Sequence, residues 1–452
     1  MLPKIFTGFI KESAVTVMVR SLLERLLNPE QLDAWFDRTA ESQYTRDLLF
    51  SSVFGLMLEV VCRVRPSVNR AYDAHVEELP VSLASVYNKL NGLETHTSAE
   101  LVRYSAAEAV ALIQEIGGER ESLLPGYRVR MLDGNCLEAT EHRIATLRDE
   151  RAGALPGKSL VVYEPALGVA TDVFPCEDGH AQERSLLGDV LARVSTNEVW
   201  VADRNFATAD FLTGLEQRGA FFVMREHQGG FRWSPEAPMG VADNSETGEV
   251  SEQPIYFTDK AGQKYHWRRI RVALEKPTRD GDEYLSILTN LPASAASALQ
   301  VAELYRKRWT IETAFQHIEQ NLNSEINTLG YPKAALFSFC MALVAHNLMA
   351  VVMAALRCEH GEETIDERFS TYAMAEEIST TYRGMMIAIP AEQWQYFSPI
   401  PVAEFATTLL TMARAVKLKA FLKRKQSVKK KKTKAAFNKR KPHVATAKLL
   451  QK

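Results

Sequence analysis

The chain has 452 residues, 46% of them hydrophobic, and a formal net charge of −2. This length and composition place it among soluble globular proteins with one large core or two to three domains. Its five cysteines are scattered and form no CxxC pair, which argues against a disulfide framework and a structural zinc site and fits a reducing cytoplasm.

The first 115 residues show helical periodicity, most clearly over residues 47–64, and predict a small helical domain. Within it, residues 81–90 have two equally consistent interpretations. They form either a recognition helix that turns Tyr87 and Lys89 toward a DNA groove, or an ordinary packing helix with polar residues on its outer face.

After residue 126 the pattern becomes strand-like. Four short segments rich in strand formers, separated by turns or a helix, predict an α/β core: residues 128–132, 159–163, 168–174 and 198–202. The first and last run directly into Asp133 and Asp203. Carboxylates at the carboxyl ends of strands project into the crevice where open α/β sheets bind ligands. Taken singly, each aspartate is equally explained by a turn or a helix cap.

Residues 226–290 interrupt this alternation and predict a mostly β insertion. Its strand-like pieces are residues 254–258, 264–274 and 284–291. Aromatic and basic side chains such as Trp233 and Arg269 are mixed in it, as they are on surfaces that contact DNA. Half-buried strands with a charged outer face have the same composition, so both interpretations stand.

Residues 305–312 read Tyr-Arg-Lys-Arg-Trp-Thr-Ile-Glu and predict a helix with Tyr305, Arg308 and Glu312 on one face. A carboxylate beside a guanidinium offers an oxygen ligand for a hard cation and a fork of donors for phosphate oxygens. The alternative is a solvated helix face with an ion pair between residues four apart.

Residues 334–356 are almost entirely apolar and long enough to span a membrane. His346 and Asn347 lie near the middle, where lipid would leave their polar groups without partners. We therefore expect a helix buried in a soluble core.

Charge is distributed very unevenly along the chain. Residues 414–452 contain 16 Lys or Arg and no Asp or Glu, so a tail of +16 follows a body of −18. Such a tail favours the phosphate backbone of nucleic acid through counterion release. A solvating role or contact with an acidic membrane are the alternatives. The start of the chain lacks the pattern of a secretion signal, so we expect a cytoplasmic, nucleoid-associated protein without a membrane partner.

Asp133, Asp203 and Glu312, in this order and with Tyr305 and Arg308 at their spacing from the Glu, resemble the DDE transposases of bacterial insertion sequences. The pattern is similar in particular to the type-four family with its Tyr-Arg-Glu-Lys signature. The resemblance covers about residues 125–356, includes the β insertion, and implies a ribonuclease H-like fold. The organisation expected is a helical N-terminal domain over 1–115, a catalytic domain over 125–356 interrupted by 226–290, a helical region over 357–413 and a basic tail over 414–452.

The resemblance also implies the chemistry. Asp133, Asp203 and Glu312 would hold two Mg²⁺ ions, for which Mn²⁺ would substitute, and one ion would activate water or a DNA 3′-hydroxyl while the other stabilises the leaving oxygen. DNA would be cut at terminal inverted repeats and its 3′-hydroxyl ends joined to target DNA by a homodimer. The residues implied to contact DNA are Tyr305 and Arg308 on phosphate, Trp309 on a base, and Arg204.

One position departs from the signature. The family pattern has Lys seven residues after the Glu, whereas this chain has Glu319. Lys307, Lys333 or an arginine of the insertion replaces that phosphate contact, or end binding is weakened, or the copy has decayed. Two other functions therefore remain as alternatives: a catalytically silent or domesticated DNA-binding protein, and a metal-dependent nuclease that does not join strands.

Overall fold

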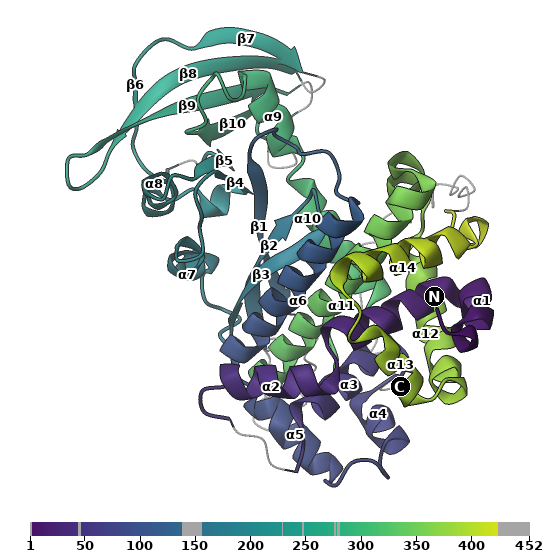
Figure 1. Cartoon of the computed structure of the whole chain (residues 1–452). Helices are drawn as coiled ribbons and strands as arrows, with labels where there is room; N and C mark the ends of the chain where they lie inside the picture. Colours follow the sequence, from purple (N-terminus) through teal and green to yellow (C-terminus); the bar gives the residue numbers. More distant parts are fainter. Residues whose placement is uncertain are drawn as a thin grey trace, which may run out of the picture.

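The computed structural model describes residues 2–43, 47–137, 156–227, 229–245, 248–274, 277 and 281–423. It is a mixed α/β structure in which the strands of the insertion lie at one end and a body of helices lies at the other (Figure 1). Most of the predicted basic tail, residues 424–452, lies outside the described residues.

The helical pattern expected over the first 115 residues is observed. The helices are α1 (Lys4–Leu26), α2 (Pro29–Thr39), α3 (Phe50–Val61), α4 (Val68–Ala74), α5 (Leu83–Gly92) and α6 (Thr95–Ile116). On α5 the Tyr87 hydroxyl donates to Asn69 Oδ1 at 2.7 Å, and the Lys89 ammonium lies 4.7 Å from the centre of the Phe36 ring. These contacts within the protein favour the packing interpretation of this helix.

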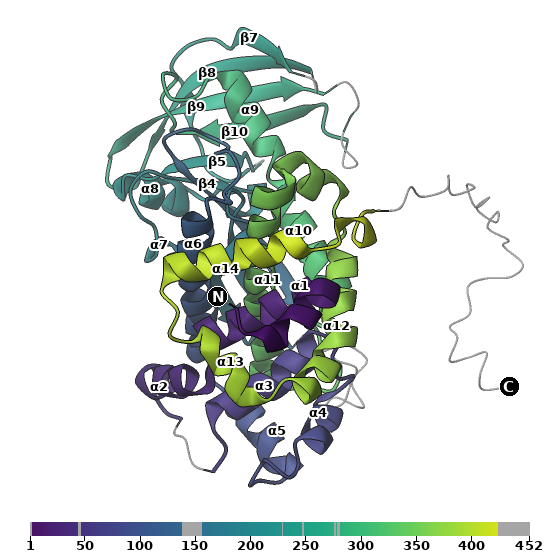
Figure 2. The ribbon, with the colours of Figure 1, turned by 45° about the vertical axis from the view of Figure 1, so that its right-hand side comes forward.

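The helical body is organised around one long helix, α11 (Pro332–His360). Its apolar side chains share a single hydrophobic core with helices from both ends of the chain. Figure 2 shows α1 and α14 crossing α11. The other helical elements after it are η4 (Thr364–Arg368), α12 (Thr371–Ala388), α13 (Ala391–Trp394), η5 (Gln395–Phe397), α14 (Val402–Ala415) and η6 (Leu418–Ala420).

The prediction that residues 334–356 form a buried helix is confirmed. α11 is long and apolar enough to cross a membrane, but 89% of its most apolar window is buried inside the protein. The polar residues near its middle bind the backbone of a strand: Asn347 accepts from the N–H of Ala170 at 2.9 Å and donates to its carbonyl at 3.0 Å, and the His346 ring bonds the Gly168 carbonyl at 3.0 Å. These bonds fix α11 to the edge strand of the sheet.

The sheet has ten strands in the order β3-β2-β1-β4-β5-β10-β9-β8-β6, with β7 paired to β8. β1 runs parallel to β4, and β4 to β5, whereas β2 and β3 are antiparallel to their neighbours. The strands of this first half are β1 (Arg128–Leu137), β2 (Gly157–Glu164), β3 (Val169–Cys176), β4 (Glu198–Ala202) and β5 (Phe221–Arg225). Between them lie η2 (Glu183–Leu186), α7 (Leu187–Leu191), η3 (Arg204–Phe206) and α8 (Ala209–Gln217).

The predicted insertion is β-rich, as expected, and it extends the main sheet. Its strands are β6 (Ser234–Pro235), β7 (Gly240–Ser245), β8 (Gly248–Thr258), β9 (Lys264–Ala273) and β10 (Tyr284–Thr289). β10 pairs antiparallel with β5, so the insertion continues the ladder of the core strands. The chain then enters α9 (Ala298–Arg306) and α10 (Trp309–Asn321), which pack on the buried face of β1, β4 and β5.

The bonds between α11 and β3 give a stability prediction. Asn347→Ala leaves the buried N–H and carbonyl of Ala170 without partners, and we expect it to lower the free energy of unfolding by about 2–4 kcal/mol. Urea unfolding followed by circular dichroism measures this. The matched control is Asn88→Ala on the exposed side of α5, which should change stability by less than about 0.5 kcal/mol. Equal effects of the two substitutions would contradict the assignment.

Candidate active site

Asp133 and Asp203 lie at the same level of neighbouring parallel strands. The pairing of β1 with β4 ends at Leu132 and Ala202, and each aspartate is the next residue. The expectation that the first strand ends at Asp133 is wrong, because β1 continues to Leu137 along β2. Asp133 is therefore held inside a strand, whereas Asp203 follows β4 directly and begins η3.

The helix expected over residues 305–312 is two helices joined by a short turn. α9 starts at a capping box between Ser297 and Gln300 and ends at Arg306. The N–H of Arg308 then bonds the carbonyl three residues back, at 2.9 Å, which tightens the chain before α10 begins at Trp309. The break turns Tyr305 toward Asp203 and leaves Arg308 and Glu312 one helical turn apart.

Arg308 joins the acidic residues of the site. Its Nη2 lies 2.7 Å from Glu312 Oε1, and its Nη1 lies 3.5 Å from Asp133 Oδ2. The residue is only 7% exposed, and its Nε is buried without a hydrogen-bond partner among the described residues. Burial would lower the pKa of Arg308, but Tyr305 and the three carboxylates outweigh it and raise the pKa. The guanidinium is thus a fixed positive charge among the three acids.

Tyr305 packs against the same group of side chains and contacts Asp203. Its hydroxyl donates to Asp203 Oδ1 at 3.3 Å, and the residue is 6% exposed. Burial, reinforced by the charge of Asp203, raises the pKa of Tyr305, so the hydroxyl keeps its proton. The structure therefore places the Tyr305 hydroxyl against the carboxylate of Asp203, which it orients.

The Asp133 carboxyl group is a weaker acid than an ordinary aspartate. Burial raises its pKa to about 6; Arg308 and a hydrogen bond from the Gly134 N–H oppose the rise, and the charges of Glu312 and Glu183 add to it. A carboxylate that is costly to ionise in isolation gains most from an added positive charge. This side chain is therefore suited to binding a cation.

The side of the site toward solvent carries the predicted DNA contacts. Trp309 is 61% exposed, and the Arg308 guanidinium lies 5.1 Å from the centre of its ring. Arg204 lines a pocket of about 430 Å³ together with Arg225 of β5 and with Arg232, Trp233 and Arg269 of the insertion. Two acids in the same lining pair with two of these arginines: Asp282 with Arg225, and Glu226 with Arg269. Aromatic and basic side chains of the insertion thus lie next to the segment that follows Asp203.

Glu319 lies on the exposed part of α10, about two turns beyond Glu312. Its backbone carbonyl accepts a hydrogen bond from Arg63 at 3.1 Å. Lys307 is exposed in the turn between α9 and α10, next to Arg308, whereas Lys333 lies in the first turn of α11. Of the two lysines considered as substitutes, Lys307 is adjacent in sequence to the acidic group.

Sequence reasoning missed one acidic residue of this region. Glu183 lies at the start of η2, and its negative charge adds to the raised pKa of Asp133. Its carboxylate contacts the backbone at Gly134. It follows no strand end and belongs to no recognisable motif. Only the tertiary packing of η2 against β2 and η3 brings it to this region.

The three acids have the chemistry of a divalent-cation site, although Arg308 lies among them. Within the described part of the chain, no three His, Cys, Asp or Glu side chains are close enough together to hold a metal ion. Carboxylate oxygens are the ligands that Mg²⁺ prefers. The chemistry of the three acids suits such an ion, but they would have to move closer together, with Arg308 releasing one of its carboxylates, before they could hold it.

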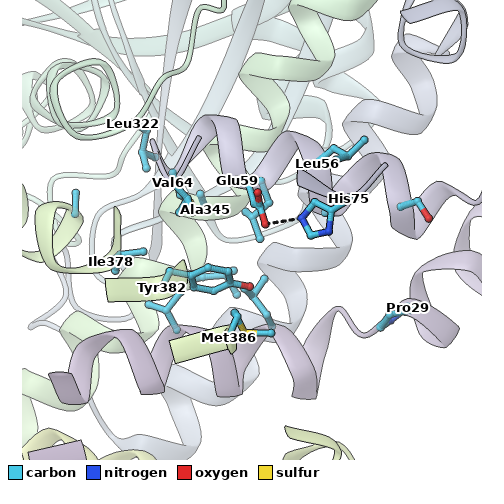
Figure 3. Close-up of a pocket in the computed structure, with 18 of the residues that line it drawn as sticks. Pro29, Leu56, Glu59, Val64, His75, Leu322, Ala345, Ile378, Tyr382 and Met386 are labelled. Atoms are coloured by element: carbon cyan, nitrogen blue, oxygen red, sulfur yellow. Dashed lines mark hydrogen bonds and ion pairs between the residues drawn. The ribbon is translucent and has the colours of Figure 1, made fainter. Parts of the chain in front are cut away.

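A second hollow, of about 470 Å³, lies in the helical body away from these acids (Figure 3). Apolar side chains such as Leu56, Ile378 and Met386 line most of it. It has two acidic lining residues. Glu59 is bonded to His75 at 3.0 Å and to Arg65 at 3.3 Å, and Glu78 is bonded to His75 at 3.2 Å. With both carboxylates already engaged, this cavity does not compete with the acids around Arg308 as a reaction site.

Residues 124–348 match the family model described as a transposase DDE domain. This part of the chain is similar to a transposase DDE domain, and we refer to it as the DDE domain. It begins just before β1 and ends within α11, so it contains Asp133, Asp203, Glu312 and the whole β insertion. The broad prediction of a DDE transposase domain from the insertion sequences is thus confirmed, whereas membership of the type-four family stays a prediction.

Relatives of the DDE domain occur in bacterial insertion sequences. The transposase for insertion sequence element IS421 of Escherichia coli is 25% identical over 261 residues, which cover 50% of this chain and 65% of that protein. The probable transposase for element IS5377 of Geobacillus stearothermophilus is 26% identical over 208 residues, covering 45% of this chain and 51% of that protein. Both matches span less than two-thirds of the relative's own length.

One solved structure was matched along most of the chain at a low score. It is the piggyBac transposase synaptic complex with hairpin DNA, determined by cryo-electron microscopy, at a TM-score of 0.39 and 10% sequence identity. The likeness covers 87% of this chain and 84% of that one.

The acidity of Asp133 predicts how stability depends on pH. Because burial raises its folded pKa to about 6 from an ordinary value of 3.8, ionised Asp133 destabilises the metal-free DDE domain above about pH 6, and the effect disappears as the pH falls below 4. We expect Asp133→Asn to raise the free energy of unfolding by up to about 3 kcal/mol at pH 8 and to have little effect near pH 4.

Urea unfolding in the presence of a chelator at several pH values measures this change. Asp189→Asn, which removes an exposed carboxylate on α7, is the control and should show no such pH dependence. A stabilisation by Asp133→Asn that is the same at every pH would contradict the burial argument.

Proposed function

We propose that this protein is a DNA transposase that cuts DNA at the terminal inverted repeats of an insertion sequence and joins the freed 3′-hydroxyl ends to target DNA. The observation that carries the proposal is the grouping of three acids from separate elements: Asp133 and Glu312 contact the buried guanidinium of Arg308, and Asp203 accepts a hydrogen bond from the adjacent Tyr305. The match of residues 124–348 to the transposase DDE domain supports the same reaction class.

The proposed fold of the catalytic core is ribonuclease H-like. In support, β1 lies at the centre of β3-β2-β1-β4-β5, with β2 antiparallel to it and β4 and β5 parallel. This arrangement brings the carboxyl ends of the parallel segments of β1 and β4 to one edge. Asp133 and Asp203 lie at that edge, and α10 supplies Glu312 from the side.

The chain's own residues perform distinct tasks in the proposed mechanism. Arg308, beside the exposed ring of Trp309, offers its donors to a phosphate of the transposon end, while Tyr305 keeps the Asp203 carboxylate oriented. When bound by Asp133, Asp203 and Glu312, two Mg²⁺ or Mn²⁺ ions would supply an activated water or 3′-hydroxyl and stabilise the leaving oxygen. Phosphate contact by Arg308 also frees Asp133 and Glu312 from their shared guanidinium.

The proposed partners are double-stranded DNA, at both transposon ends and target, and a second copy of the chain in a synaptic complex. Basic and aromatic side chains of the insertion, beside Arg204, support a DNA path from the acids toward β9 and β10. The proposed setting is the cytoplasm, in association with the nucleoid. The basic residues after 423 would add contacts to phosphate that do not depend on sequence.

Cleavage of a DNA duplex that carries the end of the element tests the proposal. With Mg²⁺ we expect a cut that leaves a 3′-hydroxyl, and Glu312→Gln should reduce the rate by at least about 100-fold because it replaces a charged carboxylate ligand with a neutral amide at the site of reaction. Denaturing gel electrophoresis of end-labelled strands measures the products, and addition of target DNA tests joining.

The control is Glu303→Gln on the exposed side of α9, which should cut at the normal rate. Binding of the end without cutting by either the parent or the control would support the silent DNA-binding alternative, with Glu319 the first position to change to Lys. Cutting without joining would support the nuclease alternative.

The role of the basic tail has a separate test. Removing residues 424–452, which leaves the packed helices up to η6 intact, should flatten the slope of log affinity for DNA against log salt by several ions. Fluorescence anisotropy with a labelled duplex at several salt concentrations measures the slope. An unchanged slope would exclude the tail from DNA binding.

A further inference from the structure

A small cavity of about 140 Å³ lies where the sheet meets α11 and the helical elements that follow it. Its walls come from β2, from the second half of α10, from α11, and from η4 and α12. On α10 it is lined by His317 and Asn321, which lie beyond Glu312. The cavity is therefore distinct from the candidate active site.

Two guanidinium groups share one carboxylate at this cavity. Arg120 donates to both oxygens of Asp366, at 2.6 Å from Nε and 3.0 Å from Nη2. Arg357 donates through Nε and Nη2 to the carbonyl of Gly118, and its Nη1 lies 3.6 Å from Asp366 Oδ1. The second guanidinium is thus held beside the carboxylate without a hydrogen bond to it.

The charges around the cavity do not balance. Arg120, Arg357 and Lys423 supply three positive charges to the described lining, and Asp366 supplies one negative charge, which leaves +2. The cavity's two histidines add no charge at neutral pH, because burial lowers the pKa of both. Glu362, outside the lining, offsets part of the charge of the two arginines. The remaining positive charge favours an anion.

Buried donors in the lining are free to bind that anion. Arg357 is 5% exposed and Tyr163 is 7% exposed. Among the described residues, neither Arg357 Nη1 nor the Tyr163 hydroxyl has a hydrogen-bond partner. Burial raises the pKa of Tyr163 against the opposing effect of the two arginines, so its hydroxyl keeps a proton to donate. A buried donor without an acceptor is costly, and a bound anion would remove that cost.

Gly168 shows that donors from two elements meet at one place. An ideal Cβ built on Gly168 would lie 3.1 Å from Arg120 Nη1 and 3.7 Å from the Tyr163 hydroxyl. The guanidinium from the segment after α6 and the hydroxyl from β2 therefore approach the same point. A group with several acceptor oxygens, such as phosphate, can bind donors from both at once.

We propose that this cavity is a binding site for a small phosphate-type oxyanion, held by Arg357 Nη1, the Tyr163 hydroxyl, Arg120 and Lys423. Its volume is below the range of about 300–1,000 Å³ that is usual for larger organic ligands, so it suits a single phosphate group. The bound anion would join β2 and α11 to Lys423, which belongs to the basic C-terminal region. Free inorganic phosphate and a phosphate group of bound DNA offer the same chemistry.

The test is the affinity of the full-length, DNA-free protein for inorganic phosphate, measured by isothermal titration calorimetry at constant ionic strength. Tyr163→Phe removes one donor and keeps the ring, and we expect it to weaken phosphate binding by about tenfold. Lys423→Met removes a charge from an exposed residue, so folding is not at risk, and should weaken binding by at least about threefold.

The matched controls are Tyr331→Phe, at an exposed tyrosine before α11, and Lys419→Met, at an exposed lysine of η6. Both should bind phosphate like the parent. The proposal is overturned if the parent shows no saturable binding, or if Tyr163→Phe and Lys423→Met bind as tightly as their controls. Circular dichroism of each variant checks that the fold is kept.

Competition separates the two sources of the phosphate group. The titration is repeated with the parent and Tyr163→Phe in the presence of a short DNA duplex. Loss of the difference between them would support an anion site that DNA phosphate fills. A difference that persists would support an anion site reserved for the free ion.

Discussion

The contact of Arg308 with carboxylates from two elements is the interaction on which the site depends. Asp133 and Glu312 lie on a strand and a helix that are far apart in the sequence but close in space. Their like charges repel one another. The guanidinium at 2.7 Å from Glu312 and 3.5 Å from Asp133 offsets that repulsion in a buried setting. Tyr305 brings Asp203 into the same group through its hydroxyl.

The β insertion matters to this arrangement because of where it returns the chain. β10 pairs with β5, and α9 then crosses the buried face of the core strands. Val301 and Leu304 of α9 and Ile311 of α10 are buried against that face. Without the returning strand, the helices that carry Tyr305, Arg308 and Glu312 would have no fixed path across β4 and β1.

Local pattern was sufficient to predict the elements that hold the site, but not the detail of their packing. Strand propensity followed by an acid identified Asp133 and Asp203, and apolar length with two polar residues identified α11 as a core helix. The extension of β1 past Asp133 depends on pairing with β2, which no local pattern encodes. The break between the two helices at residue 307 depends on the different partners of the side chains on either side of it. Tyr305 contacts Asp203, whereas Arg308 contacts Glu312 and Asp133. Glu183 was missed because its place depends on Gly134 and Asn205, distant residues that only the fold assembles.

The hydrogen bonds between α11 and β3 have a mechanical consequence. α11 belongs both to the DDE domain and to the core that unites the helices of the two chain ends, and Asn347 fastens it to β3. β3 is paired to β2, and β2 to β1, the strand that carries Asp133. The helical body and the strand that carries Asp133 are therefore joined by a continuous series of hydrogen-bonded elements. A displacement of the helical body would be passed through α11 and three paired strands to the candidate site.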